Sequence, residues 1–543
     1  MAVPVLTPQA ARSTSILDKK LSHSSPGKWG VLAFSLLLLG GLLYIGNALK
    51  LDLSAARLHS IFPFLLLGIA LLSALAFEFV NGFLDTANAV ATVIYTHSLD
   101  PYVAVVFSGI LNFVGVLFSS GAVAFAIIGL LPVEIFLKIS HGSGFSMVFA
   151  VLIAAIVWNI GSWWKGLPVS SSHTLIGSIL GVALSYRLVL GAQSASLDWG
   201  QIQRVLVALL ISPAIGFCFA GLVLFLFRLA RRDPRLYQEP QGSTPPPFYI
   251  RALLIITCGG VSYAHGSNDG QKGMGLIMLI LVGTIPTAFA LNHQVHLRGA
   301  QDFAVLSRQA AAAIGHSLGS DPAPAPSLSA AGVELQHFIA TKTYDPAVLP
   351  ALETEINTLA AEGASYASLA AIPPVLQPAI SNQMFLCSQA LRLLPGRTGA
   401  PRFNPKDAAT LATYQKFLNR STRFIPIWVK VAVALALGLG TMVGWRRIVI
   451  TVGEKIGKTH LTYAQGAAAQ LVAMVTILAA GAWGLPVSTT HVLNSGIAGT
   501  MTANGSGLQW TTIRNIAMAW VFTLPIAALL SGSLFYLFHL FVH

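Results

Sequence analysis

Two short segments rich in Ser and Thr contain side chains that could bind a ligand. Residues 166–173 read GLPVSSSH and residues 484–491 read GLPVSTTH, so six of the eight positions are identical. In each segment Gly-Leu-Pro ends an upstream helix, because Pro lacks an N–H group and disfavours helix in the residue before it. Ser and Thr favour the N-cap, so the sequence predicts that a new helix begins in each segment.

These helix starts predict an anion site. Unpaired N–H groups, the positive end of a helix dipole and several hydroxyls together favour a tetrahedral oxyanion. Neither cluster contains Lys or Arg, and a neutral site suits a protein that must release its cargo. His173 and His491 could each bond the anion, relay a proton or fix the loop. The alternative is that the hydroxyls only cap interrupted helices. The candidate anion ligands are Ser170, Ser171, Ser172, Ser488, Thr489 and Thr490.

A second pair of segments contains carboxylates within apolar sequence. Residues 81–88 read NGFLDTAN and residues 265–272 read HGSNDGQK, which aligns Asp85 with Asp269. Placing a carboxylate in a membrane costs free energy unless the group is paired or solvated. Such a residue is therefore first interpreted as a functional one. The candidate residues for coupling to a cation or a proton are Asn81, Asp85, Asn88, Asn268, Asp269 and Lys272, and Glu78 is a further buried carboxylate.

These polar residues suit a hard cation or a proton. Asn81, Asp85 and Asn88 share one helix face if the segment is helical. Oxygen ligands of this kind favour Na⁺, which we place at Asp85, Asn88 and Asp269 as one alternative to a proton. Lys272 could instead pair with a carboxylate or occupy a cation position. The alternative is that these Asp and Asn residues are buried and only cap helices.

The composition indicates a membrane protein. Only 9% of the 543 residues are charged and 55% are hydrophobic, against roughly 25% charged residues in a soluble domain. This excludes a disordered chain and a single soluble globule. The formal net charge of +13 is best explained by cytoplasmic loops, so no nucleic-acid partner is expected. We expect an all-α polytopic fold with about ten to twelve transmembrane helices, some of them interrupted, in contact with the lipid bilayer.

The two halves of the chain resemble each other and are predicted to be homologous. The spacing from the Asp to the Ser/Thr cluster is 85 residues in the first half and 219 in the second, and the excess matches a polar insert. The sequence does not decide whether residues 250–291 form one crossing or two. The predicted segments are a basic tail (1–28), an extra span and loop (29–60), a first repeat (61–249), the start of a second repeat (250–292), an extramembrane insert (293–424) and the remainder of the second repeat (425–543).

At these motifs the sequence resembles the inorganic phosphate transporter (PiT) family, and its bacterial low-affinity branch in particular. The resemblance rests on NGFLDTANAVATVIYT (81–96), GLPVSSSHTLIG (166–177), HGSNDGQKGMGLIMLILVG (265–283), GLGTMVGWRRIVITVGEKIGK (438–458) and GLPVSTTHVLNSGIAGTM (484–501). It implies a multi-pass protein of the bacterial inner membrane with inverted repeats. It also implies that inorganic phosphate binds the Ser/Thr residues and a coupled cation binds the Asp/Asn residues.

Two positions depart from the family pattern. Leu84 stands where the family usually has His or Asn, and Lys272 stands where the other half has Asn88. These departures favour symport with H⁺ over Na⁺, with a divalent metal bound to phosphate as a further form of the substrate. Arsenate is expected to compete, a homodimer is compatible with the sequence, and no cofactor is expected.

Other functions are compatible with the same residues. A sulfate-type oxyanion permease would use similar helix starts, and an uncoupled anion channel would not need the carboxylates. Ser172 and His173 could form the nucleophile and base of a membrane hydrolase. The duplication argues against this, because a catalytic pair is rarely needed twice, so we do not expect an enzyme.

Overall fold

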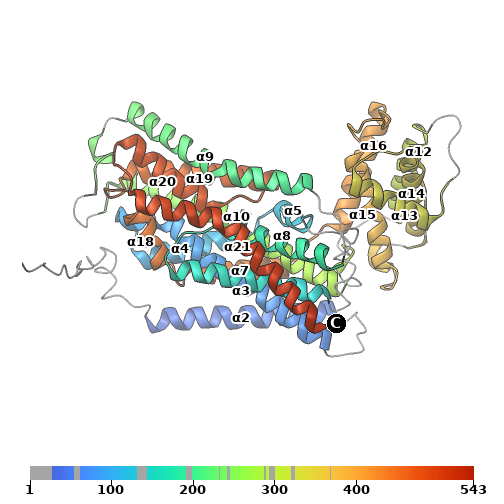
Figure 1. The fold of residues 1–543 in the computed structure, drawn as a ribbon, viewed down its shortest axis with the longest axis horizontal. Coiled ribbons are helices and arrows are strands. Elements are labelled where there is room, and N and C mark those ends of the chain that lie inside the picture. The colour runs from blue at the N-terminus through green and yellow to red at the C-terminus, as the bar shows by residue number, and fades with distance from the viewer. Residues whose placement is uncertain are drawn as a thin grey trace, which may run out of the picture.

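In the computed structural model the described residues form helices joined by turns and loops, with no β-strand among them (Figure 1). It describes residues 27–53, 62–130, 143–190, 199–231, 233–240, 245–285, 289–292, 300–318, 325–366 and 368–542. Most of the predicted basic tail lies outside these residues. The predicted all-α membrane fold is confirmed.

A bundle of long helices forms the membrane body. Among the described residues, seven helices are long and apolar enough to cross a bilayer, or up to nine if each of two bent helix pairs is one span. Helices α8 and α20 lie outside that count, so the expected ten to twelve crossings stay a prediction. The helices of this body are α2 (Lys28–Leu53), α3 (Phe62–Tyr95), α4 (Pro101–Leu117), α5 (Ala122–Ile128), α7 (Ser143–Trp164), α8 (Ser171–Leu190), α9 (Trp199–Ala230), α10 (Phe248–Thr284), α17 (Ile427–Thr441), α18 (Arg446–Glu454), α19 (Tyr463–Ala482), α20 (Thr489–Asn504) and α21 (Trp510–Val542).

Helix α10 answers the question about residues 250–291. It runs unbroken from Phe248 to Thr284, and 37 residues at about 1.5 Å per residue are ample for one crossing. Helix α3 is likewise continuous through residues 81–88. Each carboxylate motif therefore lies in the middle of a long helix, whereas each Ser/Thr motif lies at a break between two helices.

The packing of the membrane helices is reciprocal. Helix α3 packs against α17 while α10 packs against α4, and α8 packs against α21 while α20 packs against α9. Helices α7 and α19 follow the same rule, since α7 contacts α3 and α21 while α19 contacts α10 and α9. Two related halves that interlock would produce this pattern.

The breaks before α8 and α20 have the same local geometry. Gly166 and Gly484 both have φ of +67°, a left-handed conformation that favours glycine. The loop carbonyls are satisfied from elsewhere in the fold: Thr451 Oγ1 donates to Gly166 O at 2.8 Å, and Trp520 Nε1 donates to Pro168 O at 3.0 Å. Each new helix therefore begins at a fixed place and in a fixed direction.

Residues 300–422 form a separate helical bundle with its own core, at one end of the membrane body in Figure 1. Phe338, Leu352 and Tyr414 are fully buried in this core. The segment that leads into the bundle and the last helix of the bundle are linked by a hydrogen bond, in which Asn292 N donates to Ser421 O at 2.8 Å. Its helices are α12 (Ala300–Gly315), α13 (Leu328–Thr341), α14 (Val348–Ser365), α15 (Gln377–Leu393) and α16 (Pro405–Thr422).

Close backbone contact between α3 and α17 positions the first carboxylate motif, and a matched pair of glycines tests it. A β-carbon at Gly82 would lie 2.8 Å from Thr441 N and closer still to Leu437 O, whereas none of the non-neighbouring atoms lies within 4 Å of such an atom at Gly68 in the same helix. We expect Gly82→Ala to destabilise the protein by about 1–3 kcal/mol. Gly68→Ala should be neutral or slightly stabilising. Thermal unfolding of both variants in detergent measures the difference, and equal midpoints would contradict the packing described.

Candidate functional site

The four motifs converge on one buried cluster between α3, α10 and the first turns of α8 and α20. All fourteen side chains predicted from the sequence are buried. Those that directly contact one another at the centre are Asp85, Asn88, Ser171, Asp269, Lys272 and Thr490.

Asp85 accepts hydrogen bonds from both Ser/Thr helix starts. Thr490 Oγ1 donates to Asp85 Oδ1, and Ser171 Oγ lies 3.3 Å from Asp85 Oδ2. Asn88 Nδ2 lies 3.2 Å from Asp85 Oδ1 and 3.1 Å from Thr490 Oγ1. One carboxylate from the first half therefore contacts hydroxyls from the motif of each half.

Asp269 is compensated chiefly by Lys272. Lys272 Nζ lies 2.6 Å from Asp269 Oδ2, and both side chains are almost completely buried. The ammonium also lies 3.3 Å from Ser171 Oγ, which is 3.5 Å from Asp269 Oδ2. The sequence predicted neutral Ser/Thr clusters, and the structure places a lysine 101 positions away in sequence beside one of them. The candidate anion site therefore has a cation at its edge.

His265 is a member of the cluster that the sequence prediction missed. Its Nε2 lies 3.6 Å from Asp85 Oδ2 and 3.5 Å from Asp269 Oδ2. The alignment of the two carboxylate motifs was the available signal, because His265 occupies the position of Asn81 in the other half. It also precedes Asp269 by four residues, which places both on one face of α10.

Neighbouring hydrogen bonds determine which nitrogen of His265 is protonated. Thr441 Oγ1 donates to Leu437 O at 2.8 Å, so it accepts from Asn112 Nδ2 at 3.3 Å. Asn112 Oδ1 then faces His265 Nδ1 at 2.7 Å and accepts its proton. His265 Nε2 therefore faces the two carboxylates with either a lone pair or a second proton.

Asp85, His265 and Asp269 form a donor set that could hold a metal ion. One ligand atom from each lies within 4.8 Å of the others. Asp269 Oδ1 and His265 Nε2 have no hydrogen-bond partner among the described residues, so both have free capacity. Carboxylate oxygen with imidazole nitrogen suits a divalent transition metal better than Na⁺, which prefers oxygen alone.

Three predicted residues bond elsewhere than to this cluster, two of them to a loop carbonyl and one within its own helix. Ser172 Oγ donates to Val487 O at 2.8 Å, and Asn268 Nδ2 lies 3.2 Å from Leu485 O. Asn81 Nδ2 lies 3.2 Å from the buried carboxylate of Glu78 instead of Asp85. In this conformation these three side chains position the loops and helices around the site.

The remaining predicted residues lie at the helix starts themselves. Ser170 Oγ accepts from His173 N at 3.2 Å, and Ser488 Oγ accepts from His491 N at 3.1 Å, so these two serines are N-caps. The imidazole rings of His173 and His491 lie 4.4 Å apart between centroids. Thr489 is buried in the first turn of α20. The two motifs thus face each other through their histidines.

A family model and individual relatives both match this chain, and they name the same family. Residues 81–531 match the sequence model of the phosphate transporter family. The low-affinity inorganic phosphate transporters PitB and PitA of Escherichia coli (strain K12) are each 40% identical to this chain, over 88% and 87% of it and over 97% and 96% of their own lengths. A solved structure described as the sodium-dependent phosphate transporter aligns with a TM-score of 0.48 and 19% identity, covering 88% of this chain and 99% of that one.

The family match covers every motif described above, since it begins at Asn81 and ends beyond α20. The relatives are named as phosphate transporters, as expected, and the apolar helices among the described residues agree with the expected multi-pass membrane protein. This chain belongs to the phosphate transporter family.

Proposed function

We propose that this protein moves inorganic phosphate across the bacterial inner membrane together with a cation, by alternating access, with H⁺ favoured over Na⁺. Phosphate binds between the starts of α8 and α20, and Asp85, His265 and Asp269 carry the coupled charge. One observation carries the proposal: Asp85 accepts hydrogen bonds from hydroxyls of both Ser/Thr helix starts.

That observation supplies a coupling mechanism. A Ser or Thr hydroxyl has one proton to donate, so Ser171 and Thr490 can each serve Asp85 or a phosphate oxygen but not both. When phosphate takes these donors, the buried Asp85 loses the bonds that stabilise its charge. Asp85 must then bind a proton or a cation. Anion binding and cation binding therefore favour each other, as the reciprocity of linked equilibria requires.

The neighbouring charges favour a proton as the coupled cation. Lys272 Nζ, 2.6 Å from Asp269 Oδ2, already neutralises that carboxylate, so a sodium ion would gain little by binding beside it. With His265 neutral, Asp85, Asp269 and Lys272 sum to one negative charge, which one proton cancels. A neutral cluster reduces the cost of moving a phosphate anion through a low-dielectric region.

The Asp85, His265 and Asp269 donor set favours a second form of the substrate, a divalent metal bound to phosphate. In that form the metal is cargo and lies between the carboxylates and the phosphate oxygens. Its charge of +2 more than cancels the single negative charge of the cluster, so this form of the substrate needs no coupled proton. The hydroxyls of the two helix starts still hold the phosphate.

The reciprocal packing of the helices supports alternating access. Helices α8 and α9 pack against helices of the second half, and α20 and α21 pack against those of the first. Rocking of one such group against the other around a central site would open the cluster to each side in turn. The burial of the cluster, with Asp85 4% and Asp269 0% exposed, is that of an occluded state.

Asp85→Asn should reduce uptake of radiolabelled phosphate into proteoliposomes to background. The amide keeps an acceptor for Thr490 but cannot gain or lose the coupled charge. Asp100→Asn is the matched control, because Asp100 is an exposed N-cap and Asn caps a helix equally well. Both variants should elute as single peaks in detergent. Normal uptake by Asp85→Asn would refute the coupling role.

The coupling ion is tested by imposing H⁺ and Na⁺ gradients separately on the same proteoliposomes. We expect an inward H⁺ gradient to drive phosphate accumulation and a Na⁺ gradient at constant pH to have little effect, because Lys272 already neutralises Asp269. Accumulation driven by Na⁺ alone would reverse this assignment. Equal uptake in all conditions would indicate an uncoupled channel.

Competition distinguishes phosphate from other oxyanions. Arsenate shares the tetrahedral geometry and protonation of phosphate, so an equal concentration should inhibit phosphate uptake strongly. Sulfate has the same shape but is not protonated near neutral pH, so it should inhibit weakly. Stronger inhibition by sulfate would instead identify a sulfate-type permease.

A further inference from the structure

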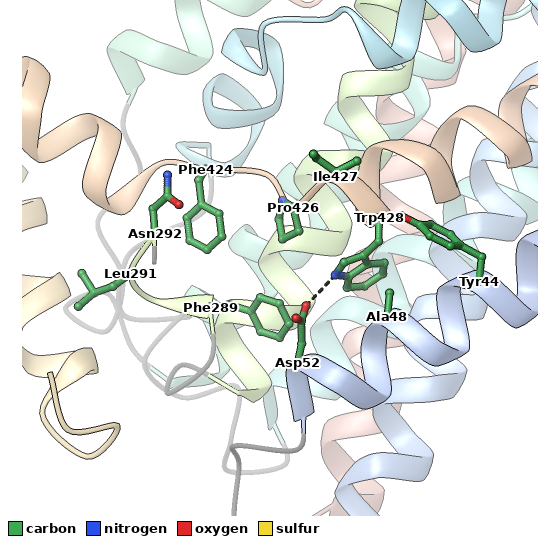
Figure 2. Close-up of a pocket in the computed structure, with 10 residues that line it drawn as sticks. All are labelled: Tyr44, Ala48, Asp52, Phe289, Leu291, Asn292, Phe424, Pro426, Ile427 and Trp428. Atoms are coloured by element: carbon green, nitrogen blue, oxygen red, sulfur yellow. Dashed lines mark hydrogen bonds between the residues drawn. The ribbon is translucent and has the colours of Figure 1, made fainter. Parts of the chain in front are cut away.

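A cavity of about 280 Å³, which shares no residue with the phosphate site, lies where the end of α2 meets both connections of the helical insert (Figure 2). This volume is slightly below the range of about 300–1,000 Å³ for whole small-molecule sites, which suits a single small group. Three separate parts of the chain form its walls. The residues that line it are Tyr44, Ala48, Asp52, Phe289, Leu291, Asn292, Phe424, Pro426, Ile427 and Trp428.

Asp52 is the one charged residue in this lining. Its Oδ2 accepts a hydrogen bond from Trp428 Nε1 at 2.8 Å, and no Lys or Arg nitrogen among the described residues lies within 4 Å of the carboxylate. In Figure 2 the rings of Phe289 and Trp428 lie close to the carboxylate. A carboxylate beside aromatic side chains attracts an organic ammonium group by charge and, where the ammonium lies over a ring face, by cation–π attraction.

The position of α2 indicates where such an ammonium comes from. The helix has 26 residues, so at about 1.5 Å per residue it is about 39 Å long, against roughly 30 Å for the hydrocarbon of a bilayer. Asp52, one residue before its end, therefore lies at the level of the lipid headgroups. Of the residues of α2, which is described throughout, only Gly41 is buried. Lipid is thus the abundant neighbour of this helix and of the cavity beside it.

We propose that this cavity binds the ammonium group of an aminophospholipid headgroup, with Asp52 as its counter-ion. The bound headgroup bridges α2, the segment 289–292 and the start of α17. It thereby fixes the extra N-terminal helix and both connections of the insert to one another. Nothing in the phosphate site takes part, so this inference stands independently of the proposed transport mechanism.

Native mass spectrometry of the full chain tests the proposal. The protein is purified in detergent, stripped of lipid and exposed to equal amounts of phosphatidylethanolamine and phosphatidylglycerol. We expect the wild type to prefer the ethanolamine lipid by about five- to thirty-fold, the range that one cation–π and charge contact supplies. Asp52→Asn should abolish this preference, although the amide can still accept from Trp428.

Two further variants keep the test decisive. Asp52→Glu retains the charge and should retain the preference, whereas Asp100→Asn removes an exposed carboxylate elsewhere and should leave it unchanged. Equal binding of both lipids by the wild type, or an unchanged preference in Asp52→Asn, would overturn the proposal. Displacement of the lipid by soluble glycerophosphoethanolamine at equal concentration would overturn the assignment to a lipid.

Discussion

The burial of Asp85 and Asp269 is the constraint on which the rest of this structure depends. Both carboxylates lie in the middle of membrane helices and are almost completely excluded from solvent. Such a group costs several kcal/mol unless it is hydrogen-bonded or paired. Lys272 compensates Asp269, and hydroxyls at two helix starts compensate Asp85. The broken helices, the left-handed glycines and the close helix contacts all serve to bring those hydroxyls to the carboxylates.

In the mechanism that we propose, the same compensation makes the site work. Hydroxyls that stabilise a carboxylate are also good ligands for phosphate, and each can serve only one acceptor at a time. In the proposed mechanism, phosphate therefore competes with Asp85 for these hydroxyls, and a proton or a cation bound by Asp85 favours the bound phosphate. No permanent positive charge has to bind the phosphate tightly, since the nearest ammonium is already paired with Asp269. A paired lysine and neutral hydroxyls allow release as well as binding.

Much of this arrangement could be predicted from the sequence because the motifs are duplicated. The repeated GLPVS segments predict two helix starts, and Pro and Ser explain each break locally. The i, i+3 spacing of Asp269 and Lys272 made their pairing a foreseeable alternative. His265 was overlooked because its counterpart is Asn81, which differs in chemistry. The cavity at Asp52 could not be predicted, since its walls come from segments hundreds of residues apart that meet only in the folded chain.

A cryo-EM map of the full chain in lipid nanodiscs with saturating arsenate, compared with a map without it, would test the central claim most directly. The account predicts a tetrahedral density between the first turns of α8 and α20, within hydrogen-bond distance of the Ser171 and Thr490 hydroxyls, with both hydroxyls turned away from Asp85. Density at any other place, or density at this place with the bonds from Ser171 and Thr490 to Asp85 intact, would contradict it.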